Sequence, residues 1–285
     1  MSRLAGILAI LAVGNTGALG AQPVLPYHDG LNRYATTAEV IAGNALVGGI
    51  AAALQATVHG KDPFRAFGIG AVGGLVHLAG KNFAVEGGAA RAWGGLLVGH
   101  AGTSIVLNAG RGVHPFQELV LPLGPMRLRV LPRDSNKVRA SVNLFEAGWL
   151  LRTATRDGIR FDWERTFSTG ALAFVTEHRM LFRDDEELAG VALAPYYLLS
   201  EFARDVDETA RHEVVHLFQQ QFIQETLGWP LEQLVRSRIW RGHMIPRWIE
   251  VGVGGAAIAT FDHWISNGDG LRAIQEAEAQ LLHRR

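Results

Sequence analysis

The sequence predicts an α+β fold, in which a glycine-rich helical region precedes an antiparallel sheet and then a helical domain. Charged residues are scarce over residues 1–110, where Gly, Ala, Val and Leu dominate. Apolar and polar residues alternate at period two between 119 and 177, which is typical of strands. From residue 205 onward the pattern is that of capped helices. The change in composition places the main boundary near Arg111.

The overall composition excludes several classes of function. The chain has 285 residues, enough for one large domain or two small ones. Its 27 basic and 27 acidic residues balance, so no overall field favours nucleic acid. It has no cysteine, which excludes disulfides, thiolate zinc sites and cysteine nucleophiles. Any metal site must therefore use His, Asp or Glu.

Residues 1–21 have the pattern of a signal peptide. Arg3 supplies the positive start, Leu4–Val13 forms the apolar core, and small residues before Gln22 supply a cleavage region. A retained N-terminal anchor helix is the alternative. Either interpretation predicts a membrane-bound or exported protein of the cell envelope.

Residues 22–110 are expected to form membrane helices. Three apolar stretches share a loose glycine-rich pattern: Val40–Val58, Ala66–Gly80 and Ala92–Gly110. Small residues spaced three and four apart let helix backbones approach closely, as in membrane bundles. The alternative is a buried helical layer in an exported soluble protein. The polar residues His77, His100, Ser104 and Asn108 form a functional seam or, more simply, satisfied packing groups.

The region from 119 to 177 predicts several antiparallel strands. The segments "MRLRVLP", "KVRASVNLF" and "GIRFDWERTF" alternate, and the turn signals "PRDSN" and "TRDG" separate them. The series ends with "GALAFVTEH" at 170–178. Arg127 and Arg129 are expected to be solvated strand residues, since such a sheet has one wet face.

The helical region, 205–285, begins with a well-punctuated helix. Asp205 or Asp207 caps its N-terminus, Gly228 stands past its end, and Pro230 blocks continuation. Apolar residues at helical spacing lie between these signals, so a helix of about 20 residues is expected.

Two histidines on this helix suggest a metal site. His212 and His216 are one turn apart and project from the same face, so their imidazoles can meet one ion. Glu213 lies about 100° round the helix, close enough to reach a water at the metal without ligating the metal. The ion would lower the pKa of that water, and the carboxylate would take its proton during attack on a carbonyl.

A zinc site of this class needs a third protein ligand. Glu250 is the candidate, because it stands among apolar residues and glycines, where a carboxylate needs a metal or a basic partner. Pro246 can open a helix that carries Glu250, and Gly252 would let that helix lie close to the first.

The segments "HEVVH" and "PRWIEVGVGG" together resemble the gluzincin branch of the zincin metallopeptidases, over residues 205–264. The resemblance implies that His212, His216 and Glu250 are Zn²⁺ ligands and that Glu213 is the general base. Residues 111–285 would then be a zincin-like metallopeptidase domain acting on a peptide or protein substrate. The family also implies a sheet edge that binds the peptide, for which 170–178 is the candidate.

The sequence departs from that family in two places. Val251 follows the glutamate where a glycine is usual, and Gly254 stands where some gluzincins have an aspartate that orients a ligand histidine. That orienting role would pass to Asp207 or Asp262. Candidates for the transition-state donor are His243 and His263.

Three functions remain open. The first is a zinc metallopeptidase of gluzincin type, and the intact Glu213 favours it. The second is a non-catalytic zincin-like protein. The third is a membrane structural or transport protein in which the motif is accidental, and the glycine-rich helices favour this one. Cleavage preference, membrane topology and oligomeric state do not follow from the sequence.

Overall fold

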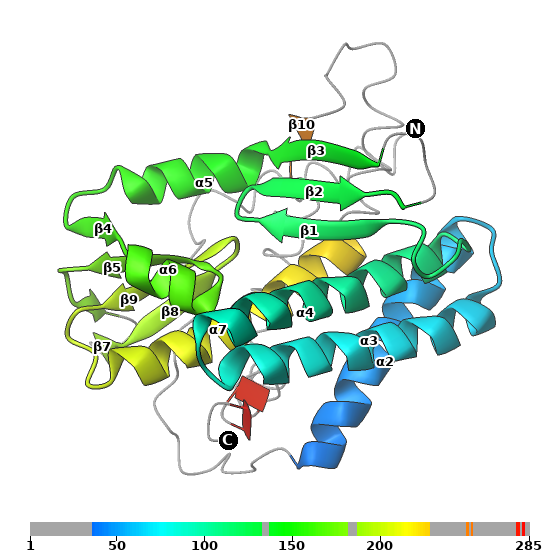
Figure 1. Cartoon of the computed structure of the whole chain (residues 1–285), viewed down its shortest axis with the longest axis horizontal. Coiled ribbons are helices and arrows are strands. Elements are labelled where there is room, and N and C mark those ends of the chain that lie inside the picture. Colours follow the sequence, from blue (N-terminus) through cyan, green and yellow to red (C-terminus); the bar gives the residue numbers. More distant parts are fainter. Residues whose placement is uncertain are drawn as a thin grey trace, which may run out of the picture.

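The computed structural model describes residues 36–132, 137–181, 187–228, 249–250, 252, 278–279 and 281–282. Helices and two small mixed sheets make up this part of the chain, so the predicted α+β class is confirmed. The long helices of the first half of the chain pack beneath the first sheet, and the helix at 206–223 packs against the second (Figure 1). The predicted signal peptide lies outside the described residues.

The glycine-rich stretches form the helices α2 (Thr37–Val58), α3 (Pro63–Val85) and α4 (Ala89–Gly110). Local signals begin the first two. The Thr36 hydroxyl accepts from the Glu39 amide at 3.2 Å in a capping box, and Pro63 follows a capping aspartate. Helix α3 extends past the predicted end at Gly80 and so includes Lys81.

Glycine sets the separation of these helices. A Cβ atom on Gly74 of α3 would lie 2.1 Å from the carbonyl oxygen of Asn44 in α2. One on Gly102 of α4 would lie 2.4 Å from the amide nitrogen of His77 in α3. Since no side chain fits at these distances, glycine is what permits backbone-to-backbone contact across both interfaces.

Within the described residues, α2 is the one helix that is long and apolar enough to cross a membrane. Helix α4 is largely buried, because β1, α6 and α7 pack against it. The core helix of a soluble protein passes the same length and composition test as a membrane span. The large exposed apolar side chains of α2 are Ile41, Leu46, Val47, Ile50, Leu54 and Val58.

The first sheet, sheet A, has the order β1 (Leu119–Leu123), β2 (Met126–Val130), β3 (Val138–Asn143), β10 (Ile249–Glu250). Its first three strands are antiparallel neighbours, as the alternation predicts. Strand β10 comes from more than a hundred residues downstream and pairs with β3 in parallel. This last pairing makes the sheet mixed.

The predicted helix carrying Glu250 is wrong at the described positions. Ile249 pairs with Val142 and Glu250 pairs with Asn143, so both are strand residues. Gly252 has φ +81°, which lies outside the right-handed helical region. The open edge of β3 offers backbone donors and acceptors, and residues 249–250 form their backbone hydrogen bonds with them.

The second sheet, sheet B, has the order β4 (Ile159–Phe161), β5 (Leu172–Thr176), β9 (Tyr196–Ser200), β8 (Gly190–Leu193). Its outer pairs are antiparallel, whereas β5 and β9 are parallel. The prediction of a purely antiparallel sheet is therefore wrong at this central pair. A small hairpin of β6 (Met180–Leu181) and β7 (Glu187–Leu188) lies in the connection.

Two helices interrupt the region expected to be only strands: α5 (Leu144–Ala154) and α6 (Trp163–Thr169). Each begins at a capping side chain. Asn143 accepts from the Glu146 amide at 3.2 Å, and Asp162 accepts from the Arg165 amide at 3.0 Å. These caps end the preceding strands and start helices, although the alternating pattern continues through them.

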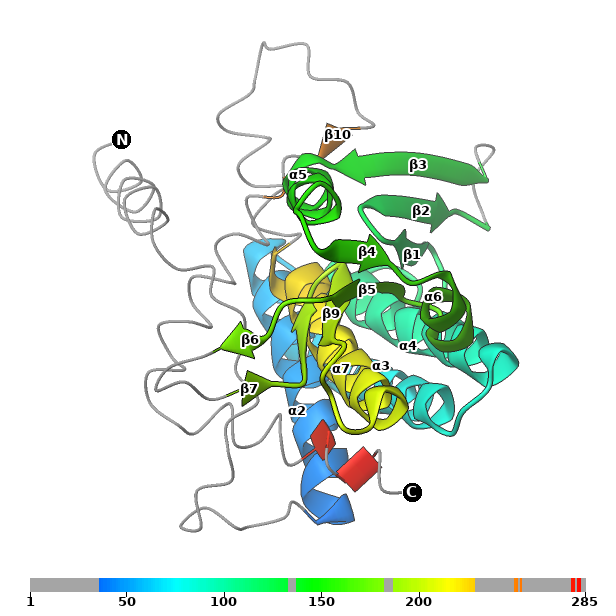
Figure 2. The same ribbon diagram turned by 90° about the vertical axis from the view of Figure 1, so that its left-hand side faces the viewer.

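The predicted helix at 205–228 is confirmed as α7 (Val206–Ile223), followed by the π-helix η2 (Gln224–Gly228). Asp205 is its cap and accepts from the Glu208 amide at 2.8 Å. Helix α7 runs between sheet B and α3 (Figure 2). One hydrophobic core contains residues of the helical layer, of sheet B and of α7. The boundary near Arg111 therefore marks a change of composition and not of core. This core includes Ala84, Leu96, Val175, Tyr197, Leu199, Val214, Leu217 and Phe218.

Candidate functional site

The two histidines of the motif meet on α7. The Nε2 atoms of His212 and His216 lie 3.0 Å apart. Their rings are nearly perpendicular, with centroids 4.7 Å apart. His212 is half-buried and His216 is buried. The spacing of one helical turn therefore brings the two Nε2 atoms within hydrogen-bonding distance, so that one donates to the other.

Glu213 lies at the side of α7 that faces sheet B. Its residue is 1% exposed, and its side chain packs on the backbone of β8 at Gly190. A Cβ atom on Gly190 would lie 2.9 Å from the Cγ of Glu213, so glycine is what leaves room for the carboxylate. The predicted general base is thus buried beside an edge strand.

The predicted peptide-binding strand is wrong. Segment 170–178 forms β5, which lies between β4 and β9 in sheet B and has no free edge along most of its length. The edge strand nearest the motif is β8. Gln220 of α7 already pairs with it, donating to Ala192 O at 3.1 Å and accepting from Ala194 N at 3.0 Å.

A polar chain supports His216 from behind. Its Nδ1 lies 2.9 Å from Oε1 of Gln219, whose Nε2 donates to Glu278 at 2.7 Å. Glu278 also accepts from Lys81 and from Nδ2 of Asn44 at 2.8 Å. Lys81 and Asn44 belong to α3 and α2, so the glycine-rich layer is linked to the histidine pair through Glu278 and Gln219.

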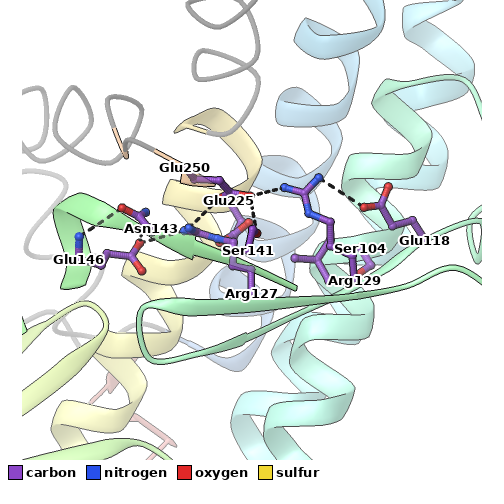
Figure 3. Close-up of polar contacts among 10 residues, drawn as sticks. Ser104, Glu118, Arg127, Arg129, Ser141, Asn143, Glu146, Glu225 and Glu250 are labelled. Carbon is purple, nitrogen blue, oxygen red and sulfur yellow. Dashed lines mark hydrogen bonds and ion pairs between the residues drawn. The ribbon is translucent and has the colours of Figure 1, made fainter. Parts of the chain in front are cut away.

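Glu250 is not brought together with the imidazoles. Its carboxylate accepts from Arg127 Nη1 at 3.0 Å, from Arg129 Nη2 at 2.7 Å and from Ser141 at 2.7 Å (Figure 3). Arg127 also binds Glu225, which lies nine residues beyond His216 on α7 and η2. That spacing corresponds to roughly 13 Å along a helix.

Arg127 is the centre of a buried ion cluster. Besides Glu250 it binds Glu225 through Nε at 2.5 Å and Glu146 through Nη2 at 2.9 Å. The expectation that Arg127 is a solvated strand residue is wrong, since it is 6% exposed. Burial alone would lower the pKa of Arg127, but the three carboxylates outweigh it and raise that pKa.

The cluster has more carboxylates than guanidinium groups to neutralise them. Burial raises the pKa of Glu146 to about 7, Arg127 opposes this rise, and the charge of Glu225 adds to it. Arg129 gives further positive charge but divides it between Glu250 and Glu118. Burial and the neighbouring carboxylates therefore make Glu146 easier to protonate than a carboxyl in water, although it pairs with Arg127.

The residues of the predicted polar seam have packing roles. Ser104 donates to His100 O at 2.7 Å and accepts from Val120 N at 2.9 Å, which joins α4 to β1. His77 stacks on Phe222 of α7, with ring centroids 4.3 Å apart. Burial holds the pKa of His100 down to about 4. These contacts join α4 to β1 and α3 to α7, and burial favours the neutral form of His100.

The donor set fits a metal ion in part. Two nitrogens bound to one tetrahedral zinc ion lie about 3.3 Å apart, and the observed 3.0 Å is close to this. Imidazoles are also ligands that zinc prefers. Within the described residues, however, no group of three or more His, Asp or Glu side chains is placed to hold an ion.

Other sequence-predicted candidates are placed elsewhere or are not described. Asp207 accepts from Arg165 at 3.1 Å and its side chain is largely exposed, so it does not orient a ligand histidine. His243, Asp262 and His263 lie outside the described residues. A cleft of about 320 Å³ lies beside the first turns of α7, and the imidazole pair does not line it.

Sequence reasoning missed Gln219 and its partners Asn44, Lys81 and Glu278. Gln219 stands one turn after His216 on the same face of the helix, and that spacing was a usable signal. The sequence offered no comparable signal for the other three, because they meet only in the folded chain.

Comparison of the chain with protein-family models, with curated proteins and with solved structures finds no match.

Proposed function

We propose that the chain is a zinc-dependent hydrolase of peptide bonds, with His212 and His216 as metal ligands and Glu213 as general base. The observation that carries the proposal is the convergence of the two Nε2 atoms, 3.0 Å apart on one helix face. Two imidazoles held at this separation suit a zinc ion without rearrangement of the helix.

Each group then has a defined task. A bound zinc ion would polarise the substrate carbonyl and lower the pKa of a water molecule. Glu213 accepts the proton of the attacking water and delivers it to the leaving amine. Its burial against Gly190 excludes bulk water, which strengthens electrostatic interactions at the site.

The described residues supply no third ligand, and the sequence candidates His243, Asp262 and His263 lie outside them. Glu250 is engaged by two guanidinium groups and a hydroxyl. Moving it to the imidazoles would leave the buried Arg127 and the partly buried Arg129 with fewer counter-charges, which is costly. Glu250 therefore has a structural role in this proposal.

A second candidate is a non-catalytic, zincin-like protein. The observation that favours it is the placement of Glu250 in the arginine cluster together with the lack of a three-ligand group among the described residues. In that case the histidine pair would stabilise the packing of α7.

We place either function in the cell envelope. The N-terminal segment 1–21 supports export, and the exposed apolar residues of α2 support contact with a membrane.

Metal analysis of the full chain tests the site. We expect one equivalent of zinc in the wild type and its loss in His212→Ala and in His216→Ala. His59→Ala is the control, since His59 is an exposed histidine at the end of α2. Glu250→Gln tests whether Glu250 is the third ligand, and we expect zinc to be retained. A wild type that binds no zinc would sink the proposal.

Hydrolysis of labelled casein then separates the two candidates. Glu213→Gln should keep its zinc and lose at least about 100-fold in rate, because proton transfer by a general base contributes that much or more. A zinc-loaded wild type with no hydrolysis favours the non-catalytic candidate.

A further inference from the structure

Three donors converge on Glu278. The Lys81 ammonium forms an ion pair with it, and the side-chain amides of Asn44 and Gln219 donate to it at 2.8 and 2.7 Å. The residues Lys81 and Glu278 are almost fully buried. A carboxylate with a cation and two amide donors around it is satisfied as an anion.

The charge on Glu278 determines how Gln219 must be oriented. Burial alone would raise the pKa of Glu278, but the charge of Lys81 and the surrounding donors outweigh it and lower that pKa. An ionised carboxylate only accepts hydrogen bonds. The amide nitrogen of Gln219 must therefore face Glu278, and its carbonyl oxygen must face His216.

The orientation of Gln219 in turn determines the tautomer of His216. A carbonyl oxygen only accepts, so Nδ1 of His216, 2.9 Å away, must carry the proton. A neutral imidazole with Nδ1–H has its lone pair on Nε2. In the metal-free chain that atom accepts a hydrogen bond from Nε2–H of His212, and an ion at this position would take the place of that proton.

We propose that Lys81, Glu278 and Gln219 form a relay that positions His216 with its Nε2 lone pair directed at the metal position. The relay rests on the zinc site proposed above, because its purpose is to present a ligand nitrogen. Groups behind a ligand histidine fix its ring and tautomer and strengthen its binding to metal.

The glycine-rich layer acquires a role in this arrangement. Asn44 accepts from Lys81 at 2.8 Å and donates to Glu278, so α2 and α3 hold the carboxylate between them. Their separation at this point is set by Gly74, whose position against the Asn44 carbonyl admits no side chain. Close packing of α2 and α3 thereby fixes the position of Lys81 and Asn44 around the Glu278 carboxylate.

Nitrogen-15 NMR of the metal-free full chain tests the tautomer. We expect His216 as the Nδ1–H form in the wild type and a mixture of tautomers in Glu278→Gln, because a neutral amide can either donate or accept. A wild-type His216 in the Nε2–H form overturns the relay. This measurement of the His216 tautomer needs no zinc, so its result does not depend on whether the proposed function is correct.

Zinc affinity, measured by competition with a chelating dye, tests the consequence. Gln219→Leu should weaken zinc binding about 10- to 100-fold, as is typical when a partner behind a ligand is removed. Gln220→Leu is the matched control, because Gln220 is the next residue of the same helix and contacts β8 instead.

An affinity of Gln219→Leu equal to that of Gln220→Leu would overturn the proposal. Circular dichroism establishes that each variant is folded. Should Gln219→Leu fail to fold, Glu278→Gln gives the same comparison with a smaller change in shape.

Discussion

Arg127 is a single side chain that joins four parts of the fold. It stands on β2 and forms ion pairs with Glu146 of α5, Glu225 of η2 and Glu250 of β10 (Figure 3). Its planar guanidinium presents five N–H donors in fixed directions, which suits three carboxylates at once. A lysine at this position would satisfy fewer of them.

The stability of the protein should depend on pH through Glu146. Its pKa is about 7 in the folded chain and about 4.5 when unfolded. The folded chain thus binds an extra proton between these values. The contribution of Glu146 is fully present below pH 4.5 and is lost as the pH rises towards 7.

Urea unfolding of the wild type and Glu146→Gln at pH 5 and pH 7.5 measures this effect. We expect the variant to lose less unfolding free energy between pH 5 and pH 7.5 than the wild type does. The exposed Glu164→Gln is the control and should keep the wild-type difference. Equal differences in wild type and Glu146→Gln would refute the assignment.

At the scale of elements, the sequence predicted α2, α3, α4 and α7 well. Their caps and breakers are local signals, as Asp205 and Gly228 show for α7 and η2. The short helices α5 and α6 were missed, since their caps follow directly on alternating segments. The strand at Glu250 could not be predicted, because its partners lie on β2 and β3, more than a hundred residues earlier.

Two glycine-to-alanine substitutions in α3 should have opposite effects on the unfolding free energy, because the two glycines have different surroundings. Gly74→Ala places a methyl group against the Asn44 carbonyl and should cost about 1–3 kcal/mol or more of unfolding free energy. Gly68→Ala meets nothing within 4 Å in the same helix and should stabilise by about 0.5–1 kcal/mol.

Chemical denaturation of the two variants against the wild type measures both effects. A Gly74→Ala variant as stable as Gly68→Ala would show that α2 and α3 are not held in backbone contact.

At the scale of the molecule, the two faces of the helical layer differ. One side packs on α7 and the sheets, and α2 exposes a stripe of large apolar side chains. Ile50 and Leu54 lie one turn apart in that stripe, and each is about half exposed. No charged residue falls between Glu39 and Lys61, so the stripe is long enough to contact lipid.

Fractionation of cells that produce the full chain tests the membrane location. We expect the wild type in the membrane fraction and the double variant Ile50→Glu, Leu54→Glu depleted from it, because charges disfavour contact with hydrocarbon. Glu39→Gln, at the polar start of α2, is the control. A wild type found only in the soluble fraction would contradict a membrane location.

The sequence by itself determined the long helices and the pairing of His212 with His216, since both follow from the geometry of a single helix. Only the tertiary structure decided the partners of Glu250 and Gln219. A carboxylate among apolar residues requires either a metal or a base, and the choice between them depends on which distant side chains the fold brings within hydrogen-bonding distance.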